Sequence, residues 1–380
     1  MNIGYSFWGF LGDYKFDKDG NEVSTPDGNA FYSWSIIKKF QDYGHKVVSL
    51  MPDRDEPGYK KLGDKLFEAF CMEERAKAYR DMAKTEYKSL NEFKIIEILK
   101  EVLSGIDLIL LEWRFLIPGR NDGMAPQQPD YLIQHYILKI AKMKEIPVIV
   151  FDLDYKLTVD DIAKYGINCI IELGDKWDGK FCKRVEIPFD FDSIHWFPVN
   201  ENCNGRLVYI GNRYERDQSV NKYIEGIKGA IVYGNWNEGG RESSKQWPNI
   251  EFRNRITQKE MRDAYSNGDA TILLAKDGYY KKGFMTARLI ESIFYGVVPF
   301  FPEEFGDEVI KKYAGKFARF LKVSSSDDIM VKLQALSGYG NKLEIISYLR
   351  SHLRFMDAKN FVDNVLDIYD GYMGWLNEQW

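Results

Sequence analysis

The chain has 380 residues, of which 45% are hydrophobic and 29% charged, a balance that indicates a globular protein of two or three domains and excludes a disordered chain. Its 52 lysines and arginines against 57 aspartates and glutamates leave a formal net charge of −5, which excludes a uniformly basic nucleic-acid binder but permits a local basic cleft. The four cysteines form no CxxC pair and no zinc spacing, and no apolar stretch is long enough to span a membrane, so we expect a reduced, cytoplasmic protein.

Strands and helices alternate over the first half of the chain, which favours a parallel sheet. The expected strands are 1–7, 46–50, 107–111 and 147–152, and the expected helices are 29–43 and 131–141. Gly44 stands where a left-handed residue would end the first helix. The charged, helical pattern of residues 52–105 indicates an insertion between two strands.

The alternation restarts after residues 187–204, an irregular stretch with two prolines that we interpret as an interdomain linker. The expected strands are then 206–210, 230–233, 270–274 and 297–301, and the expected helices are 218–227, 258–267 and 284–295. Residues 343–380 form two further expected helices, the last with Phe355, Phe361, Val365 and Ile368 on one face. We therefore expect domains over 1–195 and 196–354, with a helix over 355–380 that returns to the first domain.

Two doubly wound α/β units would bring the carboxyl ends of their strands to a shared cleft, where open parallel sheets bind ligands. Arg288 and Glu291 share a helix face close to such a strand end. Arginine offers a fork for phosphate oxygens, and glutamate can accept two ribose hydroxyls, so the pair outlines a nucleoside-diphosphate site. The alternative is an ordinary ion pair on a solvated helix face.

A second strand end carries Gly211, Asn212, Arg213 and Arg216. Glycine permits a phosphate to approach the backbone, and the arginines supply positive charge. An ordinary turn with surface arginines would look the same in sequence. Two such turns in one domain favour the phosphate interpretation.

Asp152 and Asp154 lie two residues apart at the end of an expected strand, so they share a face. Either carboxylate could act as a general base, and either could instead support a turn or cap a helix. Upstream, the loop of residues 7–26 carries Trp8 and Phe10. These rings could stack on a flipped base or fill the gap that it leaves, or they could pack on their own domain. The basic stretches 276–282 and 241–245 could contact a DNA backbone or form solvated loops.

In chain order these motifs resemble the phage DNA β-glucosyltransferase family. The resemblance rests on the segments Tyr209-Ile-Gly-Asn212, Val232-Tyr-Gly-Asn235, Phe252-Arg-Asn-Arg-Ile256, Tyr280, Phe284-Met-Thr-Ala-Arg-Leu-Ile-Glu291 and Glu303-Glu-Phe305. It extends to Pro26, to Lys46-Val-Val-Ser-Leu50 and to Phe151-Asp152. The stretch around Arg288 is its most specific part.

The resemblance implies a GT-B fold, with two Rossmann-like domains and a cleft between them. It implies inverting transfer of a sugar, with glucose the leading candidate, from a UDP-sugar to the hydroxymethyl group of a modified pyrimidine in double-stranded DNA. Asp152 would be the base. Independently of the resemblance, the aromatic loop and the shared strand face make Trp8, Phe10 and Asp154 our candidates for the acceptor side. The implied donor-binding residues are Gly211, Asn212, Tyr280 and Arg288 at the phosphates, Glu291 at the ribose, and Tyr233, Gly234 and Ile256 around the uracil.

Some features stay open at this stage. Arg213 and Arg216 do not match the family position for position, so which of them contacts phosphate is undecided. The sugar and the modified base are also undecided. We expect a monomer without a membrane partner, in the host cytoplasm if the gene belongs to a phage, and a divalent metal is not predicted. The alternatives are a GT-B enzyme acting on a glycan or small molecule, and a nucleotide- or DNA-binding module without turnover.

Overall fold

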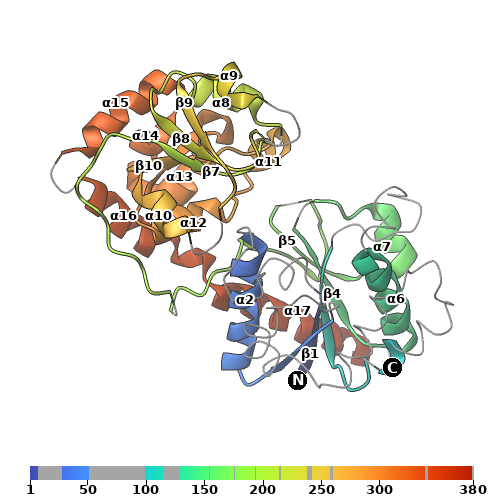
Figure 1. Ribbon diagram of the computed structural model, residues 1–380. Helices are drawn as coiled ribbons and strands as arrows, with labels where there is room; N and C mark the ends of the chain where they lie inside the picture. The colour runs from blue at the N-terminus through green and yellow to red at the C-terminus, as the bar shows by residue number, and fades with distance from the viewer. Residues whose placement is uncertain are drawn as a thin grey trace, which may run out of the picture. The chain divides into compact units, whose positions relative to one another are not determined.

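The computed structural model describes residues 1–6, 28–50, 99–101, 103–113, 129–153, 155–174, 176–192, 194–213, 215–237, 242–256, 260–338 and 341–378. The residues outside this set include Trp8, Phe10, Asp154, Arg241 of the basic stretch 241–245 and most of the expected insertion 52–105. The chain divides into two compact units (Figure 1). The first unit holds residues 1–23, 29–190 and 358–380, and the second holds residues 24–28 and 191–357.

The first unit contains a parallel sheet with the strand order β2-β1-β3-β4-β5-β6. These strands are β1 (Asn2–Ser6), β2 (Lys46–Ser49), β3 (Leu108–Glu112), β4 (Val148–Asp152), β5 (Cys169–Glu172) and β6 (Cys182–Arg184). The four predicted strands of this region are confirmed, and β5 and β6 are additional. The near-continuous burial of β3 and β4 is typical of a parallel strand covered on both faces.

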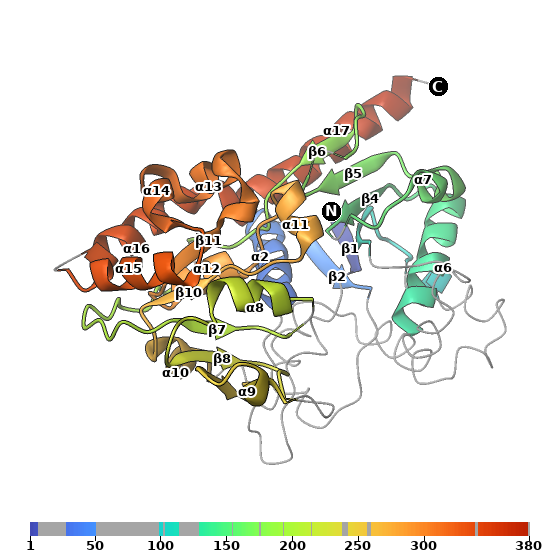
Figure 2. The ribbon, with the colours of Figure 1, turned by 90° about the horizontal axis from the view of Figure 1, so that it is seen from above.

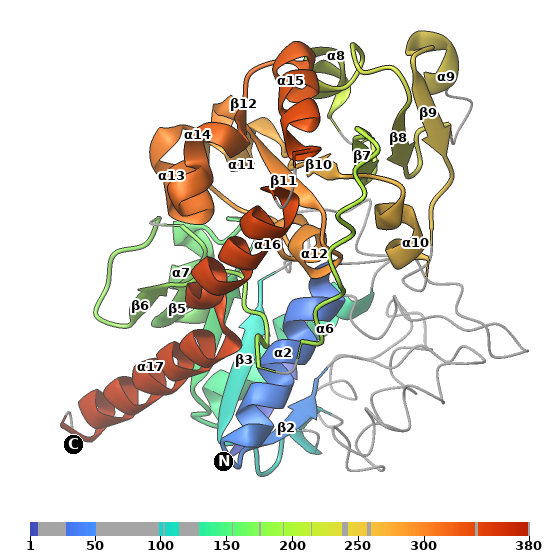
Figure 3. The same ribbon diagram turned by 90° about the vertical axis from the view of Figure 1, so that its left-hand side faces the viewer.

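Two layers of helices cover this sheet. Helices α2 (Gly28–Asp42) and α17 (Ala358–Glu378) lie on one face, where the rings of Tyr32 and Phe361 both contact Phe151 (Figure 1). Helices α6 (Pro129–Met143) and α7 (Val159–Tyr165) lie on the other face. Figure 3 shows α17, in red, running beside β5 and β6. The apolar positions Phe361, Val365 and Ile368 of α17 are buried, as a helical period requires.

The second unit contains two three-stranded parallel ladders that an isolated bridge between Leu207 and Ala270 joins. Its strands are β7 (Val208–Ile210), β8 (Ala230–Tyr233), β9 (Ile250–Arg253), β10 (Ala270–Ile272), β11 (Val298–Pro302) and β12 (Lys322–Val323). The resulting order is β9-β8-β7-β10-β11-β12, whose middle part can be followed in Figure 2. The order reverses between β7 and β10, so this is the switch point at which doubly wound sheets bind ligands.

The helices of the second unit are mostly short. They are α8 (Asp217–Tyr223), α9 (Ser243–Gln246), α10 (Met261–Ser266), α11 (Asp277–Lys282), α12 (Arg288–Phe294), α13 (Asp307–Ala314), α14 (Ala318–Leu321), α15 (Ser326–Leu336) and α16 (Asn341–His352), with 3-10 turns at Glu303–Phe305, Gly315–Phe317 and Leu353–Met356. In the described part of the chain, none of the helices combines the length and the apolar character that a membrane crossing needs.

Three expectations are corrected. The basic stretch 276–282 is mainly the helix α11 and not a loop. Gly283, in the left-handed conformation at φ 63°, ends this helix before α12 begins. Phe355 lies in a 3-10 turn against Tyr313, so it does not belong to the face of the last helix. The expected linker begins as packed chain, since Phe189 and Phe191 are buried.

Candidate functional site

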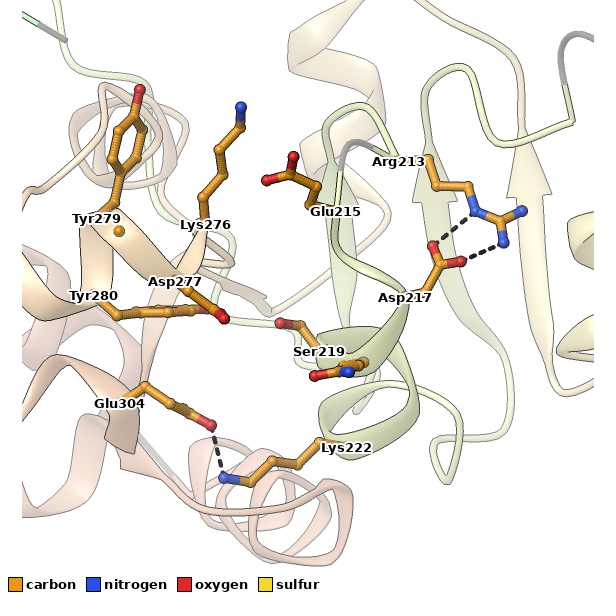
Figure 4. A pocket seen from close by; sticks show the side chains of 12 residues that line it. Arg213, Glu215, Asp217, Ser219, Lys222, Lys276, Asp277, Tyr279, Tyr280 and Glu304 are labelled. Atoms are coloured by element: carbon orange, nitrogen blue, oxygen red, sulfur yellow. Dashed lines mark hydrogen bonds and ion pairs between the residues drawn. The ribbon is translucent and has the colours of Figure 1, made fainter. Parts of the chain in front are cut away.

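A cavity of about 1040 Å³ opens at the switch point of the second unit. Its lining comes from the segment after β7, the segment after β10 and Glu304 after β11. The lining residues are Arg213, Glu215, Asp217, Gln218, Ser219, Lys222, Lys276, Asp277, Gly278, Tyr279, Tyr280 and Glu304. Figure 4 shows the side chains of Lys276 and Tyr280 across the cavity from that of Ser219, while Glu304 and Lys222 meet in an ion pair.

Gly211 and Gly234, which do not line this cavity, bring two strand ends into close contact. The backbone N–H of Gly211 donates to the Tyr233 carbonyl at 3.0 Å, and the Trp236 indole donates to the Gly211 carbonyl at 2.7 Å. Gly234 has φ 143°, and a Cβ there would lie 2.3 Å from the Gly211 carbonyl oxygen. A Cβ on Gly211 would lie 2.8 Å from Nη2 of Arg288. Position 234 therefore requires glycine, whereas a side chain at position 211 would displace the ends of the Tyr209 and Arg288 side chains.

Arg288 is the first residue of α12, and its guanidinium is fixed at the switch point. Nε donates to the Ile210 carbonyl at 2.9 Å, and Nη1 donates to the Leu274 carbonyl at 3.1 Å. The guanidinium also lies over the Tyr209 ring, 5.0 Å from its centroid. Arg288 thus joins the ends of β7 and β10 and places a positive charge beside Gly211. Glu291, one turn further along α12, acts electrostatically on this cation and on the buried Tyr265 hydroxyl.

The two undecided arginines have different surroundings. The Arg213 side chain donates to Asp217, with Nε 2.7 Å from Oδ1, and to the Ser243 hydroxyl and the Gln246 amide at 3.1 and 3.0 Å. It also lies over the Trp247 ring, so its donors are used within the protein. Arg216 instead donates through Nη1 to the Asn212 carbonyl at 2.9 Å, in the turn that follows β7.

Aromatic and apolar side chains gather near the end of β8. The Tyr233 hydroxyl accepts hydrogen bonds from Nη1 of Arg253 at 2.7 Å and from Asn267 at 3.4 Å. Ile256 packs against the buried cluster that contains Tyr233 and Val208. This corner offers a ring and an aliphatic side chain, which suits a planar base.

Tyr280 reaches the cavity from α11. Its hydroxyl accepts a hydrogen bond from the Ala275 N–H at 2.9 Å, and burial raises its pKa to about 12. The hydroxyl is therefore neutral at physiological pH and keeps its proton as a donor.

Lys222, Tyr223, Glu303 and Glu304 form a hydrogen-bonded group to which the sequence analysis assigned no role. Lys222 donates to Glu303 and to Glu304, both at 2.8 Å, and the Tyr223 hydroxyl donates to Glu304. These hydrogen bonds connect α8 with the turn after β11. Glu303 and Glu304 directly follow an apolar strand, which is the signal that could have placed them at this edge.

Asp152 ends β4 in the first unit and is fully buried. Oδ1 accepts hydrogen bonds from the N–H groups of Lys156 and Leu157 at 2.8 and 3.3 Å, while Oδ2 has no hydrogen-bond partner among the described residues. Burial raises the pKa of the carboxyl, and the backbone hydrogen bonds and Lys176, 3.9 Å from Oδ2, oppose that shift. One oxygen holds the following turn, and the other is available for a proton.

Among the described residues, no three His, Cys, Asp or Glu side chains are grouped so that they could hold a metal ion.

No family model matches the sequence, and no curated protein does. Solved structures are similar over nearly the whole chain. A T4 phage β-glucosyltransferase is 10% identical, with a TM-score of 0.52 and 98% of each chain covered. An α-glucosyltransferase in complex with UDP-glucose and DNA containing an abasic site is 11% identical, with a TM-score of 0.55 and coverage of 97% and 98%. Anabaena HepE in complex with UDP-glucose is 9% identical, with a TM-score of 0.58 and coverage of 97% and 99%. The chain therefore has the GT-B fold.

Proposed function

We propose that the protein is an inverting glycosyltransferase that moves a sugar from a UDP-sugar to the hydroxymethyl group of a modified pyrimidine in double-stranded DNA. The observation that carries this proposal is the guanidinium of Arg288, fixed by the carbonyls of Ile210 and Leu274 at the switch point. A cation held there beside Gly211, which has no side chain, suits a diphosphate.

The donor is assigned to the second unit. Arg288 and Tyr280 would hydrogen-bond the diphosphate, and Gly211 and Asn212 would let it approach the backbone. Of the two undecided arginines we assign Arg216 to the phosphates, because Arg213 is occupied by Asp217, Ser243 and Gln246.

The nucleoside would lie toward β8. Tyr233, Gly234 and Ile256 would surround the uracil, because a ring and an aliphatic side chain meet there beside a backbone free of Cβ. Glu291 would accept hydrogen bonds from the ribose hydroxyls, since it follows Arg288 by one helical turn.

The chemistry assigned to Asp152 is removal of one proton. The acceptor hydroxyl oxygen bonds to the anomeric carbon of the sugar while the bond from that carbon to the diphosphate breaks, and the bonding electrons leave with UDP. The hydroxyl proton passes to Asp152, whose Oδ2 accepts no hydrogen bond among the described residues. Because Asp152 is fully buried, acceptor binding has to expose it.

The choice of DNA as acceptor is supported by the similarity to the α-glucosyltransferase whose structure contains DNA. The proposed acceptor-side residues Trp8, Phe10 and Asp154 lie outside the described residues. At a net charge of −5, contact with DNA phosphates has to come from a local set of cations, so binding should weaken steeply with salt.

The test is a transfer assay with matched acceptors. The protein is incubated with UDP-glucose and a duplex that contains 5-hydroxymethylcytosine or 5-hydroxymethyluracil, and the digested nucleosides are weighed. The control duplex has cytosine or thymine in the same places. We expect a mass gain of one hexose on the hydroxymethylated nucleoside alone. If no UDP-sugar gives a mass gain although calorimetry shows that the protein binds UDP, the acceptor is a glycan or a small molecule and not DNA.

A further inference from the structure

Asp152 has a buried carboxylate as its neighbour. Asp152 of β4 pairs in register with Glu172 of β5, so the two side chains project from the same face of the sheet. Val150 and Ile170, two residues earlier on each strand, belong to the core beneath α6. Glu172 is 2% exposed. Two acidic groups thus lie side by side inside the first unit.

In each carboxylate, one oxygen accepts hydrogen bonds and the other accepts none among the described residues. Glu172 Oε1 accepts a hydrogen bond from the Trp177 N–H at 2.8 Å, as Asp152 Oδ1 does from Lys156 and Leu157. The other oxygens, Asp152 Oδ2 and Glu172 Oε2, are buried and have no hydrogen-bond partner among the described residues. Two adjacent buried carboxylates favour holding one proton, because a second negative charge beside the first would be repelled and poorly solvated.

Lys176 makes the two carboxylates unequal. Its ammonium donates to the carbonyls of Tyr155 and Leu157, and it lies 3.9 Å from Asp152 Oδ2. Burial raises the pKa of both carboxyls, and Lys176 and backbone hydrogen bonds oppose the shift in each. The lysine ammonium lies beside the second oxygen of Asp152, and the charge of Asp152 raises the pKa of Glu172, so the negative charge is better placed on Asp152.

The other titratable groups of the surrounding elements are engaged elsewhere. Asp161 of α7 caps its own helix, and His135 of α6 hydrogen-bonds the Tyr165 hydroxyl. On β6, burial raises the pKa of the Cys182 thiol, so this group stays a neutral thiol. Glu112 of β3 accepts a hydrogen bond from Tyr5 and belongs to the opposite face of the sheet.

We propose that Glu172 and Lys176 are positioning residues for the base: Glu172 carries the proton of the pair at neutral pH, and Lys176 keeps the charge on Asp152. This inference rests on the proposed role of Asp152. In the transfer step the acceptor proton moves to Asp152 Oδ2, and Glu172 remains protonated throughout.

The first test compares the pH dependence of kcat/KM in the wild type, Lys176→Met, Lys176→Arg and Glu172→Gln. Lys176→Met should move the acid limb up by about one pH unit, because the ionised form of Asp152 loses its cation. Lys176→Arg should restore the limb. Glu172→Gln should leave it in place, because glutamine is the neutral isostere of the protonated carboxyl. A limb that moves down by about one unit in Glu172→Gln would show that Glu172 is charged and would overturn the inference.

The second test does not need activity. The infrared band of a protonated carboxyl should be present in the wild type at pH 7 and lost in Glu172→Gln. An unchanged band, or none in the wild type, would overturn the inference. If the band is lost in Glu172→Gln as expected but the wild type has no transfer activity, the protonated Glu172 is supported and the proposed function is rejected.

Discussion

The two units carry opposite chemistry at the ends of their strands. In the second unit, the edge at β7 and β10 combines glycine with the fixed cation of Arg288 and an open cavity. In the first unit, the edge at β4 and β5 combines Asp152 and Glu172, both buried. In the proposed reaction, the edge of the second unit would hold the diphosphate and the edge of the first unit would take the proton. Group transfer with inversion needs both, which is why the contrast can be tested by changing one edge at a time.

The largest effect is expected from Asp152→Asn. The change keeps the oxygen that accepts from Lys156 and removes the ability to take a proton, so transfer should fall by roughly 10³-fold. The affinity for UDP, measured by calorimetry, should not change, because the donor is assigned to the other unit.

The matched control for this change is Glu112→Gln. Glu112 is also a buried carboxylate at a strand end, but it accepts hydrogen bonds from Tyr5 and Tyr32 on the opposite face of the sheet. It should retain most of the activity. If Glu112→Gln abolishes transfer and Asp152→Asn does not, the base has been assigned to the wrong face.

The second effect is expected at the close approach of the two glycines. Gly234→Ala would place a Cβ 2.3 Å from the Gly211 carbonyl at φ 143°, so the backbone of both turns has to move. We expect a loss of about 3 kcal/mol in the free energy of unfolding, measured with urea, together with weaker UDP binding.

Gly205→Ala is the matched control, since Gly205 also has a positive φ of 71° but a Cβ there meets nothing within 4 Å. It should cost only the backbone strain, about 1 kcal/mol, and leave UDP binding unchanged. Equal losses in the two variants would mean that the close approach contributes nothing.

These residues also show what could be predicted from sequence. Gly211 directly follows the apolar strand β7, and Arg288 begins the helix that leads into the apolar strand β11. Their places near strand ends could therefore be predicted from local pattern alone. Glu172 could not, because its role depends on the register that sets it beside Asp152, and register is a tertiary property. Helix α11 was missed for a different reason: six residues are too few for a helical period to be visible. Strands β6 and β12, of three and two residues, are likewise too short for a strand pattern to be visible in the sequence.

The third prediction distinguishes Arg216 from Arg213, the two arginines that follow β7. Arg216→Met should weaken UDP binding roughly tenfold, because a charged hydrogen bond to phosphate is lost. Arg213→Met should lower the free energy of unfolding by about 2 kcal/mol, through loss of the contacts with Asp217 and Ser243, and leave UDP affinity nearly unchanged. Calorimetry and urea unfolding of both variants check this. The reverse pattern would assign the phosphate to Arg213.

The last prediction tests the pair of Asp152 and Glu172 through stability. Burial raises the pKa of Glu172 in the folded protein, whereas the unfolded chain has the ordinary value. Between these two values the folded state binds more protons, so the stability contributed by Glu172 is complete below the ordinary pKa and is lost as pH rises through the folded one. Glu172→Gln should therefore equal the wild type in urea unfolding near pH 4 and become the more stable protein as pH rises toward 8. Since the glutamine oxygen can still accept from the Trp177 N–H, a difference independent of pH would mean that packing, not the proton, separates the two proteins.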